Sequence, residues 1–157
     1  MDKFWNRYPG MSDEIEKVVG VIQKNSKCKQ KILEEAILDL LKSGGKFLRP
    51  AFLILASDFG NKTSENIYSL AAVVEMLHMA TLVHDDVIDE SKLRRGNETI
   101  QSKYGKNFAV YVGDYLFSVC FKVLSQTSTI KKINVDSSVM AKICAGEIEQ
   151  FSSKFNT

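Results

Sequence analysis

Apolar residues recur at helical spacing through almost the whole chain, and this pattern limits the fold more than any other feature of the sequence. Proline, which interrupts helices, occurs only at Pro9 and Pro50. Clusters of β-branched residues in strict alternation, which are typical of half-buried strands, do not occur. A length of 157 residues is enough for one domain with a substantial core. The pattern therefore predicts an all-α protein, a bundle of long helices in a single domain over residues 1–157.

Glycine-containing stretches divide this pattern into separate helices. Residues 43–45, 60–61 and 96–97 combine glycine with serine or asparagine, and such residues end helices. Ser12, followed by an acidic residue and an apolar one, is expected to begin the first helix. The expected helices cover about residues 12–41, 46–59, 63–89, 107–125 and 133–155.

Composition and charge give no indication of a macromolecular partner. The formal net charge at pH 7 is +2, so nothing in it requires nucleic acid or an anionic membrane. The longest apolar runs, 51–56 and 71–74, are much shorter than the roughly 20 residues that span a bilayer, so we expect no stable membrane insertion. Cys28, Cys120 and Cys144 are widely spaced and fit no metal-ligand pattern, which favours free thiols and a cytoplasmic location.

The almost wholly apolar segment 70–84 ends in a cluster of acidic residues. A helix that is apolar on every side is a buried helix. Because unpaired buried charge is costly, such a helix is expected to present its terminal carboxylates at the rim of a cavity. Two acids at helical spacing are more often part of a solvated surface when they occur alone. The apolar segment before them favours a site instead.

Asp85, Asp86 and Asp89 form this cluster. Asp85 and Asp89 are one helical turn apart, so their carboxylates project from the same face. Two hard oxygen ligands at this spacing suit Mg²⁺, which keeps several waters and is usually bound through one or two carboxylates plus substrate phosphates. Arg94 and Arg95 follow a few residues later, and their planar guanidinium groups suit phosphate oxygens. The combination predicts a site for a metal-chelated diphosphate.

A second basic cluster lies at the start of the expected helix 46–59. Gly44 and Gly45 free backbone N–H groups at a helix N-terminus, where the helix dipole favours anions. Lys46 and Arg49 are three residues apart and can share a face, so together they can bind one phosphate group. A plain helix cap with two exposed cations explains the segment equally well when it is taken alone. The Gly-x-x-x-x-Gly-Lys-Ser/Thr pattern of a P-loop does not occur.

The two histidines are assigned different roles. His78 lies two helical turns before Asp85 on the same face, which favours a substrate-facing role. A lone histidine in an apolar helix is otherwise more often a hydrogen-bonded core residue. His84 points elsewhere and is interpreted as structural. The His84-Asp85 pair also fits an HD-type metal phosphohydrolase, but that chemistry needs more histidine ligands than the chain contains.

These motifs, in this order and spacing, resemble those of the trans-type isoprenyl diphosphate synthases, the polyprenyl synthetase family. The resemblance extends over essentially the whole chain and implies the N-terminal half of an isoprenyl synthase-type fold. The stretches that carry it are Gly44-Gly45-Lys46-x-x-Arg49-Pro50, His78, Asp85-Asp86-x-x-Asp89 with Arg94-Arg95-Gly96, Gly113-Asp114-Tyr115-Leu116, and Gly146-Glu147-Ile148-Glu149-Gln150.

The resemblance also implies a reaction and a role for each motif. The implied reaction condenses isopentenyl diphosphate with an allylic diphosphate into an all-trans polyprenyl diphosphate, with Mg²⁺ as cofactor. Asp85 and Asp89 are the implied direct metal ligands of the catalytic aspartate motif, and Asp86 supports them. The implied substrate contacts are those of Arg94 with the allylic diphosphate, and those of Lys46, Arg49, His78 and Arg95 with isopentenyl diphosphate.

In this family the residues just before the first aspartate shape the floor of the chain-elongation cavity. Here these residues are Ala80 and Thr81, which are both small, with Leu77 one turn deeper. Bulky aromatic residues at these positions would stop chain growth early. The resemblance therefore implies a product of geranylgeranyl length or longer.

The chain departs from the family in its length. Family members are roughly twice as long and carry a second Asp-rich motif, for which this sequence has no counterpart. Three interpretations follow: a piece of a full synthase, a natural half-length non-catalytic or regulatory subunit of a heteromeric synthase, or a complete enzyme. A bundle cut in half would expose apolar helix faces. We therefore expect association, either as a homodimer or with a complementary half. The resemblance implies that residues 107–155 form the homodimer interface.

Overall fold

The computed structural model describes residues 3–43, 45–60 and 66–127, together with separate positions between 138 and 153. Helices dominate these residues, and the strands among them are two residues long each. The predicted all-α class is confirmed. The elements in chain order are a 3-10 helix η1 (Lys3–Arg7), α1 (Pro9–Asn25), α2 (Lys31–Lys42), α3 (Leu48–Ser57), α4 (Ile67–Ile88), β1 (Leu93–Arg94), β2 (Asn97–Glu98), α5 (Ile100–Tyr104) and α6 (Lys106–Thr127).

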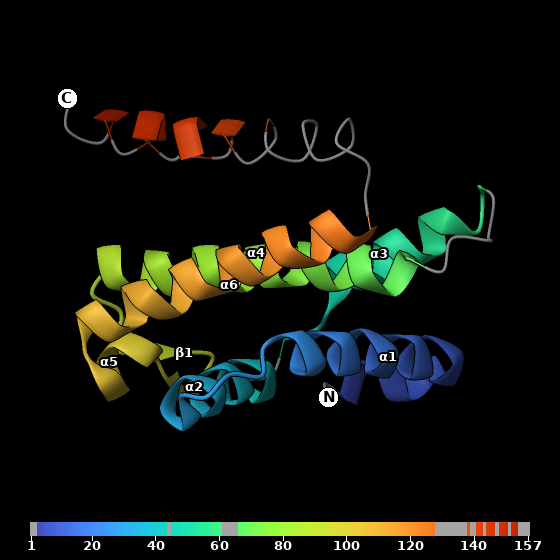
Figure 1. The fold of residues 1–157 in the computed structure, drawn as a ribbon, viewed down its shortest axis with the longest axis horizontal. Coiled ribbons are helices and arrows are strands. Elements are labelled where there is room, and N and C mark those ends of the chain that lie inside the picture. The colour runs from blue at the N-terminus through green and yellow to red at the C-terminus, as the bar shows by residue number, and fades with distance from the viewer. Residues whose placement is uncertain are drawn as a thin grey trace.

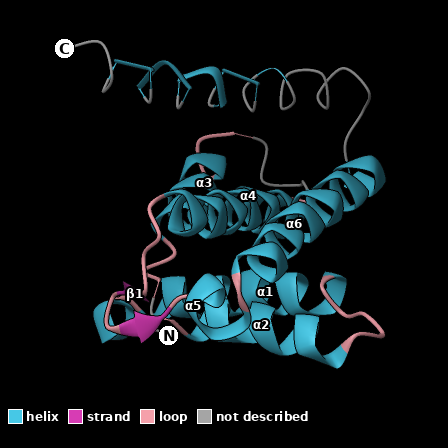
Figure 2. Cartoon of the chain, turned by 90° about the vertical axis from the view of Figure 1, so that its left-hand side faces the viewer, coloured by secondary structure: helices cyan, strands magenta, loops and turns pink. Residues whose placement is uncertain are grey.

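The long helices form two layers around one core (Figure 1, Figure 2). α3, α4 and α6 lie in one layer, and α1 and α2 lie in the other. α4 is the central element, since it packs mainly against α6 and also against α3 and α1. The core includes Ile15, Ile22, Met76 and Leu116, all of which are fully buried. Burial of each such side chain contributes about 1.5–3 kcal/mol, so this core holds the layers together.

α4 is fully buried along one side and half-buried along the other. The side chains of Met76, Ala80 and Val83 are at most 1% exposed. The last turn of the helix changes character, because Asp86 there is buried whereas Asp89, at the C-cap, is exposed. The predicted helix that ends in carboxylates is present, but it is fully buried on one side only, because the described helices cover only that side.

α4 and α6 approach closely where Gly113 faces His84. A Cβ atom on Gly113 would stand 2.3 Å from Nε2 of His84, which is closer than real Cβ atoms come to a neighbour. The same Nε2 lies 3.3 Å from the backbone oxygen of Val110 and 3.4 Å from Oδ1 of Asp114. The small residue at position 113 therefore lets the imidazole join the two helices, in agreement with the structural role predicted for His84.

The first predicted helix, 12–41, is wrong, because the structure has two helices in this range. α1 ends at Asn25, and α2 begins at Lys31. Ser26 is buried in the intervening turn, and its backbone oxygen accepts a hydrogen bond from Tyr115 of α6 at 3.4 Å. The turn lets both helices lay an apolar face on the bundle. It contains neither glycine nor proline, so no local signal in the sequence marks the break.

The predicted helices 46–59, 63–89 and 107–125 are correct in type and differ from α3, α4 and α6 at their ends. α1 begins with Pro9 in its first turn rather than at Ser12, because the fixed φ of proline suits this position. The periodicity does not predict α5 or the β1–β2 pair, since such short elements carry little periodic signal. Residues 63–65, where α4 is predicted to begin, lie outside the described residues, as does much of the predicted helix 133–155. The described positions between 138 and 153 are helical.

Two helices, α4 and α6, are long and apolar enough to cross a membrane by length and composition alone. They pack against each other in the core of the bundle. A core helix of a soluble protein passes the same test, so the finding is weak evidence for a membrane span.

Candidate functional site

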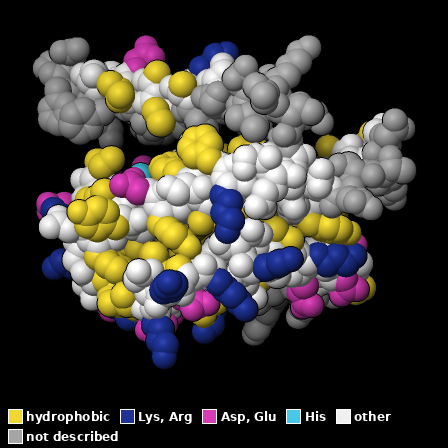
Figure 3. Space-filling view, in the orientation of Figure 1, with side chains coloured by type: hydrophobic (Ala, Val, Ile, Leu, Met, Phe, Trp, Pro, Cys, Tyr) yellow, Lys and Arg dark blue, Asp and Glu magenta, His cyan; other side chains and the backbone are white. Residues whose placement is uncertain are grey.

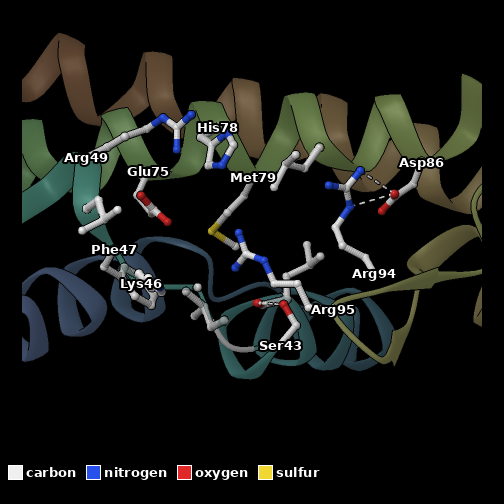
Figure 4. A pocket seen from close by; sticks show the side chains of 15 residues that line it. Ser43, Lys46, Phe47, Arg49, Glu75, His78, Met79, Asp86, Arg94 and Arg95 are labelled. Atoms are coloured by element: carbon white, nitrogen blue, oxygen red, sulfur yellow. Dashed lines mark hydrogen bonds and ion pairs between the residues drawn. The ribbon is translucent and has the colours of Figure 1, made fainter. Parts of the chain in front are cut away.

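A cavity of about 470 Å³ opens beside the C-terminal half of α4. It lies between α4, the segment 45–49 that leads into α3, and the turn that joins β1 to β2 (Figure 4). Elements that are distant in the sequence thus meet around one space. The side chains of all the predicted substrate-binding residues line it, namely Lys46, Arg49, His78, Arg94 and Arg95.

The segment before α3 positions Lys46 and Arg49. Phe47 is buried, has a positive φ of 49° and forms the N-cap of α3, so the chain turns sharply between the two cations. Pro50 lies in the first turn of α3, as predicted. The backbone oxygen of Lys46 accepts a hydrogen bond of 2.6 Å from Nε1 of Trp5 in η1. This segment is therefore anchored from both sides, by a buried phenylalanine and by a distant tryptophan.

The turn between β1 and β2 positions Arg95. Arg95 and Gly96 are its two central residues, with φ of 52° and 81°, as a two-residue type I′ turn requires. Nη1 of Arg95 would lie 3.5 Å from a Cβ atom on Gly45, so its guanidinium reaches across the cavity to the segment before α3. The sequence predicts only a helix break at Gly96. It does not predict the β1–β2 turn, because strands of two residues give no alternating pattern.

Arg94 and Asp86 form an ion pair at one end of the cavity. Nε and Nη2 of Arg94 each lie 2.8 Å from Oδ1 of Asp86 (Figure 4). Asp86 is 4% exposed, and a buried carboxylate of this kind is stable only when it is paired. The arrangement suits Asp86 to hold Arg94 in place rather than to bind a ligand itself.

Asp85 and Asp89 lie in the last turn of α4, next to the cavity but not in its lining. The backbone N–H of Asp89 donates to the backbone oxygen of Asp85 at 2.8 Å, so the helical spacing that puts both carboxylates on one side persists to this point. Among the residues that the structure describes, no group of three or more His, Cys, Asp and Glu side chains could hold a metal ion. Two oxygen ligands on their own suit an ion that takes its remaining ligands from water and from substrate phosphate.

His78 lines the cavity as an uncharged group. Its burial, together with the nearby guanidinium groups of Arg49, Arg95 and Arg94, lowers the pKa of His78 from 6.5 to about 4. The imidazole is therefore neutral at physiological pH and can donate one N–H to an anion. The alternative of an HD-type metal site lacks the ligands that it needs. His84 contacts α6, and the described residues contain no group of three or more His, Cys, Asp and Glu side chains that could hold a metal ion.

Glu75 is a residue of this site that the sequence analysis did not identify. It lines the cavity one turn before His78 and is 6% exposed, and its Oε2 has no hydrogen-bond partner among the described residues. Burial raises the pKa of this carboxyl group, while Arg49 and Arg95 lower it by a smaller amount. Figure 4 shows Glu75 and Arg95 pointing into the same space. The available signal is that Glu75 is the one charged residue within the apolar segment before His84.

The residues implied in chain-length control lie on different sides of α4. Ala80 is fully buried. Val73 and His84 both contact α6, and Ala80 lies seven residues after the first and four before the second. At this helical spacing, Ala80 is on the side of α4 that faces α6. Leu77 and Thr81, one turn apart, are only half-buried. Thr81 is therefore partly exposed, whereas Ala80 is not.

A model of the family described as polyprenyl synthetase matches residues 30–157. The heptaprenyl diphosphate synthase component 2 of Bacillus subtilis (strain 168) is 37% identical over 154 residues, which cover 98% of this chain and 44% of that protein. The protein of the same name from Geobacillus stearothermophilus is 38% identical over 94% of this chain and 46% of its own length. The chain thus spans about half the length of the curated relatives that it matches.

Solved structures of similar proteins have the same fold over most of the chain. The heptaprenyl diphosphate synthase of Staphylococcus aureus superposes with a TM-score of 0.86 at 43% identity, over 90% of this chain and 45% of that one. A polyprenyl synthase from Caulobacter crescentus, solved in complex with calcium and isoprenyl diphosphate, superposes with a TM-score of 0.82 at 31% identity. That alignment covers 87% of this chain and 42% of the other.

Proposed function

Because the chain belongs to the polyprenyl synthetase family, we propose that it supplies the N-terminal half of a trans-prenyltransferase. The proposed reaction condenses isopentenyl diphosphate with an allylic diphosphate and forms an all-trans polyprenyl diphosphate. The observation that carries this proposal is the cavity in which Lys46, Arg49 and Arg95 meet around the neutral His78. Three permanent cations around one space suit a diphosphate, which carries several negative charges on freely accessible oxygens.

In this proposal the cavity holds the diphosphate of isopentenyl diphosphate. Arg49 and Arg95 approach it from α3 and from the β1–β2 turn, and each offers a planar pair of N–H donors. Lys46 adds a mobile charge, and His78 adds an uncharged N–H. The buried carboxylate of Glu75 lies near both arginines and opposes their mutual repulsion in the absence of substrate.

The allylic diphosphate is proposed to lie beside the last turn of α4. Asp85 and Asp89 would hold Mg²⁺ there, and their oxygen-only donor set fits this ion. When bound, the metal neutralises charge on the departing diphosphate. Arg94, held by Asp86, adds a fixed positive charge on the same side.

The chemistry requires both diphosphates together. The allylic C–O bond breaks, and its electron pair leaves with the diphosphate, while the cations of the site stabilise the charge that develops there. The double bond of isopentenyl diphosphate attacks the resulting carbocation, and loss of a proton restores a double bond. The apolar residues that line the rest of the cavity, such as Met79 and Leu82, keep water away from the cation.

The proposed product is of geranylgeranyl length or longer. Leu77 and Thr81 continue the half-buried side of α4 away from Asp85, and neither is aromatic. A growing chain that starts at the aspartates can follow this side of the helix. Ala80 contributes by allowing α4 and α6 to pack closely rather than by contacting the product.

A second candidate is a half-length, non-catalytic or regulatory subunit of a heteromeric synthase. Two relatives are named as component 2 of a heptaprenyl diphosphate synthase, which favours this alternative. Exposed hydrophobic side chains, which Figure 3 shows over α2, α5 and the start of α6, are compatible with a homodimer or with a complementary half. They include Ile32, Val110 and Tyr111, which are 49%, 37% and 70% exposed. In either case the proposed location is the cytoplasm.

A prenyl-transfer assay tests the proposed function. The chain is incubated with labelled isopentenyl diphosphate, farnesyl diphosphate and Mg²⁺, first alone and then with a separately expressed C-terminal half of a homologous synthase. Product formed only with the second half supports an incomplete half-site. Product from the chain alone shows that association of this chain with itself completes the site. Absence of product in both mixtures, with both proteins folded and in complex, contradicts the proposed function.

A further inference from the structure

An aromatic segment at the N-terminus contacts the basic segment before α3. Trp5 is 6% exposed, and its indole Nε1 donates a hydrogen bond of 2.6 Å to the backbone oxygen of Lys46, 41 residues away in the sequence. The ring of Phe4 packs edge-on against Trp5, with ring centroids 4.9 Å apart, and Tyr8 completes the cluster at 6.3 Å from Trp5. A buried tryptophan normally satisfies its single N–H donor, and here the only partner that the structure gives it is this oxygen.

The same cluster also contacts the side chain of Lys46. Its Nζ lies 5.7 Å from the centroid of the Phe4 ring, within the range of a cation–π interaction. The backbone and the ammonium group of one cationic residue are thus held by neighbouring aromatic rings. The acceptor that satisfies the buried Trp5 donor is therefore the backbone of a residue whose side chain lines the cavity.

The position of this oxygen determines the positions of both cations of the segment. Phe47, the next residue, has the left-handed conformation that ends the turn and begins α3. Arg49 lies two residues further on, in the first turn of that helix. A shift of the Lys46 carbonyl group therefore moves the N-cap and, with it, the guanidinium group of Arg49 in the cavity. A displacement of only about 1 Å in such a group is enough to lose much of its function.

We propose that Trp5 is a positioning residue for the diphosphate site, acting through the backbone of Lys46. The proposal rests on the proposed function, because it takes the cavity to bind isopentenyl diphosphate. The N-terminal aromatic segment is thus a further part of the substrate site.

The first test compares two variants that each remove one polar group from the cluster. Trp5→Phe removes the indole donor, and Tyr8→Phe removes a hydroxyl group from the exposed ring beside it. Affinity for isopentenyl diphosphate is measured by calorimetry on the folded proteins. We expect Trp5→Phe to weaken binding about fivefold, as for loss of one hydrogen bond, and Tyr8→Phe to leave it unchanged. Equal affinities of Trp5→Phe and the unchanged chain would overturn the proposal.

Hydrogen exchange distinguishes positioning from a general loss of stability. In Trp5→Phe the amides of residues 45–49 and 51 should exchange faster, while those of α6 keep their protection. A merely structural role would instead raise exchange across the whole bundle and lower the melting temperature, with no change in the affinity of the folded protein. That result would overturn the proposal.

The unchanged chain provides a test that does not depend on the folding of a variant. Trp5 is the only tryptophan in the sequence, so its fluorescence reports on this contact alone. When isopentenyl diphosphate is titrated into the chain, Lys46 should move from Phe4 toward the diphosphate. The emission of Trp5, which packs against Phe4, should then change until the site is saturated. Binding by calorimetry without any change in emission would overturn the positioning role and leave the proposed function standing. Absence of binding to the unchanged chain would remove both.

Discussion

At the scale of single residues, the site combines permanent charge with one group that stays neutral. Lys46, Arg49 and Arg95 supply the cationic groups of the cavity. Burial, and secondly the nearby arginines, lower the pKa of His78 to about 4, so its imidazole is neutral at physiological pH. The cavity thus offers a neutral donor without adding a further repulsive charge. A neutral amide should be able to replace this imidazole.

The replacement of His78 tests this role. His78→Gln keeps an uncharged N–H donor, so affinity for isopentenyl diphosphate should change by less than about threefold. His78→Leu removes the donor and should weaken binding about tenfold, because a diphosphate oxygen loses its partner. Calorimetry on both variants provides the measurement. Equal losses in the two would show that the imidazole ring itself is needed.

The depressed pKa of His78 also predicts how stability depends on pH. The unfolded chain binds a proton on this imidazole below about pH 6.5, and the folded chain does so only below about pH 4. The stability that comes from the neutral group is therefore fully present above pH 6.5 and is lost progressively as the pH falls toward 4. Urea unfolding across this range should show a smaller loss in His78→Gln than in the unchanged chain. Parallel pH profiles would contradict the assignment.

Glu75 allows a stability prediction of the opposite sign. Burial raises the pKa of its carboxyl group, so ionisation at neutral pH opposes folding. Glu75→Gln should therefore raise the free energy of unfolding at pH 7, and the gain should diminish as the pH falls toward the ordinary pKa of glutamate. Urea unfolding at pH 7 and pH 5 measures the difference. A less stable variant at pH 7 would mean that attraction by Arg49 and Arg95 outweighs burial.

At the scale of elements, helical spacing predicts which faces meet but not where the chain bends. The apolar run before Asp85 indicates the buried α4, and the spacing of Lys46 and Arg49 indicates a shared face, because both are local patterns. The break at Ser26 depends on a contact with Tyr115, which lies 89 residues away, and no local pattern records it. The role of Glu75 likewise depends on arginines from two other elements.

The contact between α4 and α6 depends on the absence of a side chain at Gly113. Gly113→Ala should destabilise the chain by about 1–3 kcal/mol, because the new methyl group overlaps His84. The same change in a His84→Ala background should cost much less, since the obstructing ring is gone. Thermal and urea unfolding of the four proteins give the coupling. Equal costs in both backgrounds would show that His84 does not limit the approach of the helices.

The two small residues before the aspartates should respond differently to enlargement. Thr81 is half-buried, so a phenylalanine can be placed there without entering the core. Thr81→Phe should therefore shorten the product of the complete, reconstituted synthase. Ala80→Phe should lower stability by about 1–3 kcal/mol, because Ala80 is fully buried beside α6. Product length by chromatography and melting temperature separate the two effects. An active Thr81→Phe synthase with an unchanged product ladder would refute the chain-length assignment.

At the scale of the whole molecule, the described helices bring the cations of the proposed diphosphate site together around one cavity. The proposed site for isopentenyl diphosphate is built within this half, from η1, α3, α4 and the β1–β2 turn. Among the described residues, the proposed metal site has the carboxylates of Asp85 and Asp89, and the ion would take its remaining ligands from water and substrate. Binding of isopentenyl diphosphate should therefore precede, and not require, completion of the catalytic centre.

The most direct test is calorimetric titration of isopentenyl diphosphate into the chain without Mg²⁺. The unchanged chain should bind one molecule, Arg49→Gln should bind at least about tenfold more weakly, and Lys122→Gln should bind as the unchanged chain does. Lys122 is an exposed cation of α6 outside the cavity, so it controls for the change in net charge. Absence of binding, or an equal loss in both variants, would contradict a built diphosphate site in this half of the bundle.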